Sequence, residues 1–194
     1  MTSLVLAAFP PELADLADAP PAGWRVATAG VGAVEAAATT ARLVVEHAPA
    51  RVLFLGTCGA YDGRLAVGDL LLASAAIATS LDELEGRAFR PSLERTRFAA
   101  TWTPAAGLPS HDVAVPPAIT KTVEGAQRLA ALAPAEHLEL AGVFAACHQA
   151  RVPVAAALAV ANRVGPTSHE EWLANHVRVS RALVAAMAPV LSGP

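Results

Sequence analysis

The chain alternates dense apolar runs with segments in which apolar residues recur every three or four positions. The runs are continuous and of strand length, which is typical of strands buried on both faces of a sheet. The run at 152–161 predicts a central strand. Further strands are expected at 3–8, 25–29, 51–56, 69–79 and 114–119.

Helical spacing of apolar residues predicts the second kind of element. A short helix is expected at 11–16, and longer ones at 34–45, 123–132, 138–149 and 169–191. The helix at 138–149 places four apolar residues on one face: Leu140, Val143, Phe144 and Cys147. The glycine-rich segment 57–63 predicts a loop, and the pattern dissolves between 80 and 110.

Strands that alternate with helices indicate an α/β fold. We expect one domain over residues 1–194, with three α/β/α layers around a central mixed sheet.

Composition and charge exclude several classes of protein. The 194 residues carry a formal charge of −3, which argues against electrostatic binding of nucleic acid. The apolar runs are shorter than the roughly 18 residues of a membrane span. The first residues lack the basic segment of a signal peptide, so a cytoplasmic protein is expected. Two distant cysteines and unpaired histidines predict neither a disulfide framework nor a metal site.

Polar residues near the predicted strand ends are the candidates for chemistry, because ligands of α/β folds collect at the carboxyl ends of strands. They are Glu12, Thr57 with Gly59, Glu139 and Asn162. Each also has a structural alternative: Glu12 and Glu139 as solvated carboxylates of a first helical turn, and Asn162 as a turn residue.

Two other motifs give weaker evidence for a functional site. The run Gly30-Val31-Gly32 lacks the third glycine of a dinucleotide-binding loop. Cys147 and His148 are adjacent in a predicted helix and point about 100° apart, so a packed cysteine and a surface histidine are expected.

The ordered series of motifs resembles the nucleoside phosphorylase and nucleosidase superfamily. Its loops resemble Ala29-Gly30-Val31-Gly32 and Gly56-Thr57-Cys58-Gly59, the latter followed by Val67-Gly68-Asp69. Leu138-Glu139 before a small-residue helix resembles the family's Met-Glu helix, with Leu in place of Met. The resemblance implies a nucleoside phosphorylase-like fold, a nucleoside as substrate and no cofactor. It also implies a homo-oligomer, a dimer or higher.

The resemblance also implies roles for individual residues. Glu139 would bind the ribose hydroxyls. Asn162 would contact the purine and act as a catalytic residue by stabilising the departing base. The remaining residues expected to bind substrate are Val31, Thr57, Cys58, Gly59, Ile119, Thr120 and Leu138. Glu12 lies where hydrolytic members carry the carboxylate that activates water. Phosphorylases place arginines there, and this region offers only Arg25, so hydrolysis is favoured.

The residue at the position where the family contacts the purine suggests which base is released. Adenine-specific members carry Asp there, whereas Asn162 can serve a 6-oxopurine. The run Asn162-Arg163-Val164-Gly165-Pro166 with Trp172 resembles the futalosine hydrolases of menaquinone biosynthesis. This implies release of hypoxanthine from futalosine. The alternatives are a purine nucleoside phosphorylase, a methylthioadenosine/S-adenosylhomocysteine nucleosidase and a noncatalytic nucleoside-binding paralogue.

Overall fold

A mixed sheet organises the computed structural model, which describes residues 2–92 and 95–193. The strand order is β2-β1-β3-β7-β6-β4-β5, and β8 pairs with both β3 and β4. The strands are β1 (Ser3–Ala7), β2 (Trp24–Thr28), β3 (Val52–Ala60), β4 (Leu70–Ala78), β5 (Arg97–Ala99), β6 (Ser110–Val115), β7 (Ala135–Glu136) and β8 (Val154–Arg163). Because β8 pairs with β3 in parallel and with β4 antiparallel, it joins the two ends of the path β3-β7-β6-β4, and these five strands close into a ring.

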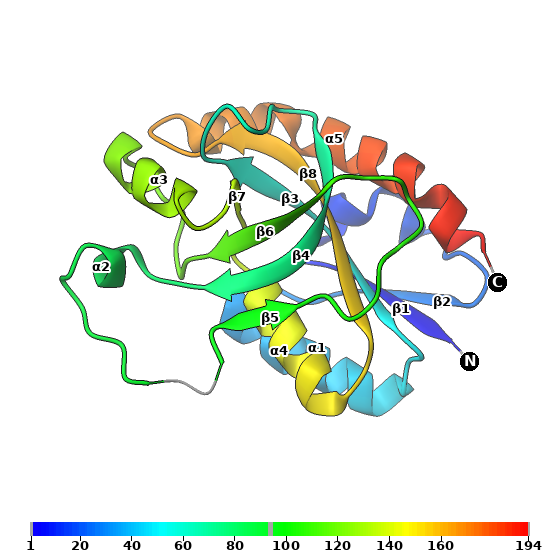
Figure 1. The fold of residues 1–194 in the computed structure, drawn as a ribbon. Helices are drawn as coiled ribbons and strands as arrows, with labels where there is room; N and C mark the ends of the chain where they lie inside the picture. Colours follow the sequence, from blue (N-terminus) through cyan, green and yellow to red (C-terminus); the bar gives the residue numbers. More distant parts are fainter. Residues whose placement is uncertain (1, 93–94, 194) are drawn as a thin grey trace.

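Helices cover the sheet on opposite sides. Figure 1 shows α5 (Ser168–Leu191) along one side, and α1 (Ala33–His47) with α4 (Leu140–Ala150) on the other. The 3-10 helix η1 (Pro10–Leu16) packs against α5. Two further helices are α2 (Leu81–Leu84) and α3 (Val123–Ala130). The predicted three-layer α/β/α arrangement around a mixed sheet is confirmed.

Strands β1, β3 and β8 bury both of their faces, as their continuous apolar runs predict. In β1, Leu4 and Leu6 join the core under α1 and α4, while Val5 and Ala7 join the core under α5. The residues of β8 divide in the same alternating way, and its central position between β3 and β4 is confirmed. Burial on two faces therefore explains why these strands carry no polar alternation.

A close contact between α1 and α4 fixes the start of α4. A side chain at Gly142 would put its Cβ 2.0 Å from the carbonyl oxygen of Ala33, so only glycine allows this approach. The predicted apolar face of α4 is confirmed, since Leu140, Val143, Phe144 and Cys147 are fully buried. This packing brings the residues just before α4 against the turn that precedes α1.

Several sequence predictions about local structure are wrong. The predicted loop at 57–63 begins inside β3, because Thr57, Cys58 and Gly59 pair with β8 and Gly59 also pairs with β7. β8 ends at Arg163 and not at 161, so Asn162 lies inside the strand and its alternative as a turn residue is wrong. Residues 80–110 contain α2 and β5, and β6 starts at Ser110 and ends before the predicted limit of 119.

Candidate active site

A cavity of about 290 Å³ opens among the carboxyl ends of β1, β3 and β8 and the starts of α4 and α5. Its lining includes every sequence-predicted site residue except Thr120. The lining residues are Ala8, Phe9, Glu12, Val31, Thr57, Cys58, Gly59, Ile119, Glu136, His137, Leu138, Glu139, Asn162, Ser168, His169 and Trp172. The fold therefore brings together four polar positions that lie far apart in the chain.

Glu12 is a buried carboxylate, with a side chain held inside the molecule by three hydrogen bonds. After Pro10 and Pro11, η1 turns it inward, so that Oε2 accepts from the backbone N–H of Ala8 at 3.1 Å. Oε1 accepts from the N–H and from the hydroxyl of Thr57, both at 2.7 Å. Glu12 is only 2% exposed, so the alternative of a solvated carboxylate is wrong.

Burial raises the pKa of Glu12 from 4.5 to about 7, against the opposing effect of the bonds from Thr57. The negative charge of Glu139 contributes in the same direction as burial. A carboxyl with a pKa near neutral pH can exchange protons during a reaction, as general acid–base catalysis requires.

The raised pKa of Glu12 predicts a pH-dependent stability. The folded state holds the Glu12 proton more tightly than the unfolded chain, so this contribution is complete below the unfolded pKa. It is lost as the pH rises through about 7. Relative to wild type, Glu12→Gln should therefore gain roughly 2 to 3 kcal/mol between about pH 5 and about pH 8. Urea denaturation at both pH values checks this, and an unchanged difference would contradict it.

Glu139 faces the same cavity from the start of α4. Its Oε1 accepts from the backbone N–H of Gly32 at 2.7 Å, a contact that the close packing at Gly142 makes possible. Gly32 has a φ of 85°, which favours glycine at this turn. Glu139 is buried, so its solvated alternative is wrong as well. Its Oε2 makes no contact with a backbone donor among those described.

His137 supports the backbone next to Glu139. Its Nδ1 accepts from the N–H groups of Glu139 and Leu140 at 3.0 and 3.3 Å, which assigns the ring proton to Nε2. Burial lowers the pKa of His137. The imidazole is therefore neutral, and the 3.1 Å approach of Glu139 Oε2 to Nδ1 is not an ion pair.

A second pair of polar groups lies across β3. Gly59 pairs with Glu136 of β7 on one side and with Asn162 of β8 on the other. Residues paired in register project from the same face of a sheet. Gly59 offers no side chain, and a Cβ there would come within 3.0 Å of Asn162 Nδ2. We name this arrangement the Glu136–Gly59–Asn162 row.

The side chains at the two ends of this row differ in how many hydrogen-bond acceptors they leave free. Glu136 accepts from the Tyr61 hydroxyl at 3.0 Å and from the Thr120 N–H at 3.2 Å, and burial raises its pKa. Thr120 therefore contacts Glu136 instead of lining the cavity. Asn162 donates from Nδ2 to the carbonyl oxygen of Arg163 at 3.0 Å, and its Oδ1 has no partner among the described contacts.

Sequence reasoning missed Glu136 and His137, and it placed no aromatic side chain in the cavity wall, although Trp172 is part of the motif that resembles futalosine hydrolases. Glu136 precedes Glu139 by three residues and belongs to a two-residue strand, which leaves no apolar run to reveal it. The aromatic residues are Phe9, His169 and Trp172. The pair Cys147 and His148 lies apart from the cavity lining: the cysteine is packed as expected, and His148, expected on the surface, is partly buried and contacts the carbonyl oxygen of Ala99.

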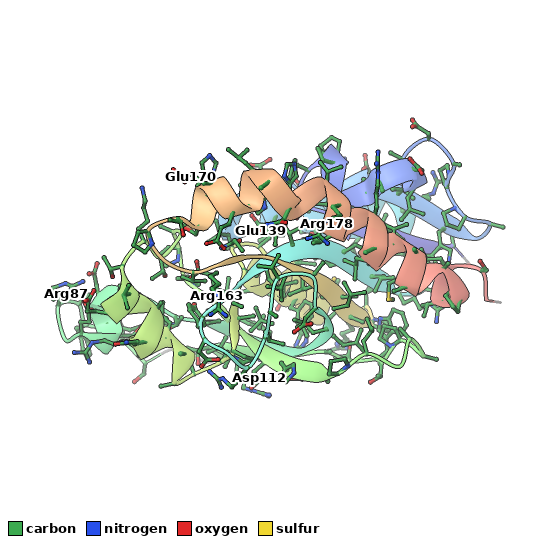
Figure 2. The ribbon with its side chains drawn as sticks, turned by 90° about the horizontal axis from the view of Figure 1, so that it is seen from above. Arg87, Asp112, Glu139, Arg163, Glu170 and Arg178 are labelled. Carbon is green, nitrogen blue, oxygen red and sulfur yellow. The ribbon has the colours of Figure 1, made fainter. Side chains whose placement is uncertain are left out.

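Charged residues elsewhere have other partners. Arg87 pairs with Asp82 and Glu85, and Figure 2 shows it at the outer end of the molecule, away from Glu139 beneath α5. Over residues 2–92 and 95–193, no three His, Cys, Asp or Glu side chains are grouped to hold a metal ion. No helix in the described part of the chain has the length and hydropathy to cross a membrane.

Comparison with known proteins identifies the fold and the family. The model of the phosphorylase superfamily matches residues 23–192. A methylthioadenosine/S-adenosylhomocysteine nucleosidase from Helicobacter pylori superposes with a TM-score of 0.85 at 17% identity, covering 98% of both chains. The enzyme of the same name from Neisseria meningitidis gives 0.84 at 20%, with 98% of both covered. Futalosine hydrolase of Helicobacter pylori gives 0.82 at 17%, with 97% of both covered.

Proposed function

Because this chain belongs to the phosphorylase superfamily, we propose that its cavity hydrolyses the N-glycosidic bond of a purine nucleoside. The observation that carries the proposal is the placement of Glu12 and Glu139, two buried carboxylates from distant segments, in one cavity. Glu12 can activate water while Glu139 holds the sugar. The names of the similar structures, all nucleosidases or hydrolases, agree with this chemistry.

Glu12 serves as the general base. Ionised Glu12 takes a proton from a water molecule, which attacks C1′ as the base departs from an oxocarbenium-like ribosyl group. Its pKa of about 7 leaves a large part of the carboxylate ionised at neutral pH. The Oε2 atom accepts one backbone bond and keeps a lone pair for the water proton.

Glu139 binds the two ribose hydroxyls. Its carboxylate is fixed by Gly32 on one oxygen and keeps acceptor capacity on the other. Val31, Leu138 and the strand residues Thr57, Cys58 and Gly59 surround the sugar. Holding the sugar in one orientation aligns C1′ with the water near Glu12.

The Glu136–Gly59–Asn162 row receives the edge of the base, with Ile119 beside it and Thr120 behind Glu136. A 6-oxopurine carries an N–H donor at N1 and, once solvent supplies a proton to N7 as the base leaves, a second donor at N7. An ionised Glu136 accepts from N1, and the free Oδ1 of Asn162 accepts from N7. Adenine presents a lone pair at N1 and would face the carboxylate unfavourably.

Hydrolysis is favoured over phosphorolysis by the charge of the lining. Among the described residues, the cavity lining contains no Arg or Lys side chain. A phosphate nucleophile is held by cationic donors in most sites that use it. The two carboxylates repel an anion and suit a neutral water.

We propose futalosine as the natural substrate. The supports are the Asn-x-Val-Gly-Pro run with Trp172 and the fold shared with futalosine hydrolase. The purified protein should release hypoxanthine from futalosine in phosphate-free buffer. Release that requires phosphate would favour a phosphorylase, and preference for methylthioadenosine would favour the other nucleosidase. Binding without release from any nucleoside would indicate the noncatalytic paralogue.

We also propose a homo-oligomer. Val31 and Ile119 line the cavity yet are 64% and 50% exposed, and Val34 and Val123 near them in the chain are exposed as well. Exposed apolar side chains that line a cavity, as Val31 and Ile119 do, are suited to cover by a second copy. Light scattering should give at least twice the mass of the 19.8 kDa chain, and a monomer would contradict this proposal. A cytoplasmic location stays a prediction.

A further inference from the structure

Trp172 reaches Glu12 through one intermediate side chain. Its indole Nε1 donates to the hydroxyl oxygen of Thr57 at 3.0 Å, across a sequence separation of 115 residues. The same hydroxyl donates to Glu12 Oε1 at 2.7 Å. Three residues, from α5, β3 and η1, thus form one hydrogen-bonded chain.

The direction of these bonds assigns the hydroxyl proton. An indole N–H is a donor only, so the Thr57 oxygen accepts from Trp172 and directs its own proton to Glu12. The backbone N–H of Thr57 donates to the same Oε1 atom. Both lone pairs of Oε1 are then occupied, whereas Oε2 accepts from Ala8 alone. A proton taken up by Glu12 is therefore expected on Oε2.

The indole is held in place by its neighbours. The His176 ring stacks on it with centroids 4.1 Å apart and planes at 12°, and Nδ1 of His176 contacts the Trp172 carbonyl oxygen at 3.0 Å. The Phe9 ring also packs against the indole, with ring centroids 5.6 Å apart and planes at 40°. A half-buried tryptophan with this support keeps one orientation, as a positioning group requires.

We propose that Trp172 is a positioning residue, which holds the Thr57 hydroxyl as a donor to Glu12 and so leaves Oε2 as the atom that exchanges a proton with water. The inference rests on the hydrolytic function proposed above. Its role differs from that of a catalytic residue, because it acts through Thr57.

Loss of the Trp172 bond changes the titration of Glu12 in a definite direction. The Thr57 hydroxyl bond lowers the pKa of Glu12, and a hydroxyl that accepts a bond is a stronger donor. Removing the indole N–H should therefore raise that pKa. The other titratable groups around Glu12 are Cys58, Glu136, His137, Glu139 and His169 in the cavity, and His176 behind Trp172.

These neighbouring groups are the same in wild type and variant. Burial raises the pKa of the Cys58 thiol and lowers that of His137, so both are neutral near pH 7. Glu139 raises the pKa of Glu12 by its charge. A shift on removing the indole N–H then reports on the chain from Trp172 to Glu12.

The test compares Trp172→Phe, Thr57→Val and the double variant. The acidic limb of the kcat–pH profile should move upward by about half to one pH unit in Trp172→Phe, so that kcat falls roughly 3- to 10-fold below the limb and little above it. Thr57→Val should shift the limb in the same direction, and the double variant should match Thr57→Val. Trp102→Phe is the control, because its indole donates to the Val52 carbonyl oxygen instead.

A second measurement separates this inference from the proposed function. The carboxyl infrared band that is lost in Glu12→Gln reports the titration of Glu12 without any substrate. An upward shift of that titration in Trp172→Phe supports the positioning role even if no nucleoside is hydrolysed. An unchanged titration in Trp172→Phe, or a further shift in the double variant beyond Thr57→Val, would overturn it. If Trp172→Phe does not fold, an unshifted titration in Thr57→Val overturns it as well.

Discussion

Glu12→Gln is expected to lower kcat for hypoxanthine release from futalosine by at least ~10²-fold, the loss typical of a missing general base. Gln keeps the size of the side chain and an oxygen for the Thr57 donors, so the folded structure should persist. It cannot take a proton from water. Steady-state rates with circular dichroism of the same samples measure both effects.

The matched control for this variant is Glu46→Gln. Glu46 is an exposed carboxylate that pairs with Arg42 on α1, remote from the cavity lining. Its rate should equal that of wild type. A wild-type rate in Glu12→Gln would remove Glu12 from the mechanism.

Asn162→Asp is expected to change the choice of base by tenfold or more. Sites built on polar pairing reject a mismatched partner strongly, because a buried unpaired polar group costs about 1–3 kcal/mol. Wild type should cleave hypoxanthine nucleosides well ahead of methylthioadenosine. A carboxyl group at this position can accept from the 6-amino group and supply a proton to N7, so the ratio of the two kcat/KM values should narrow or invert.

Two further variants make this result specific. Glu136→Gln should act in the same direction, since a Gln amide can donate to N1 of adenine. Asn175→Asp, on α5 with its side chain bonded to the Glu171 carbonyl oxygen, should leave the ratio unchanged. A wild-type preference for methylthioadenosine would show that Asn162 does not select the base.

The elements with long apolar patterns could be predicted from the sequence. The face of α4 and the central strand β8 follow from local periodicity, which needs no knowledge of partners. The closed ring of strands could not be predicted, because the antiparallel pairing of β8 with β4 depends on residues far apart in the chain. The two-residue strand β7 is too short to give any pattern.

The residues of the candidate site also divide into those that could be predicted from the sequence and those that could not. Glu12, Thr57, Glu139 and Asn162 could be proposed from their places near strand and helix ends and from a family resemblance. The burial of Glu12 could not, because its partner Thr57 follows 45 residues later. Glu136 can be recognised as a site residue only from the pairing of β7 with β3, which places it beside Gly59. Trp172 gains its role from one hydrogen bond that the sequence does not encode locally.

In the proposed mechanism, the two buried carboxylates direct water to C1′ of a nucleoside. The most direct test is the mass of the sugar product formed from futalosine in the presence of excess phosphate. The proposed mechanism predicts a free sugar with a C1 hydroxyl and no sugar phosphate, in amounts equal to the hypoxanthine released. A sugar 1-phosphate as the main product would contradict it.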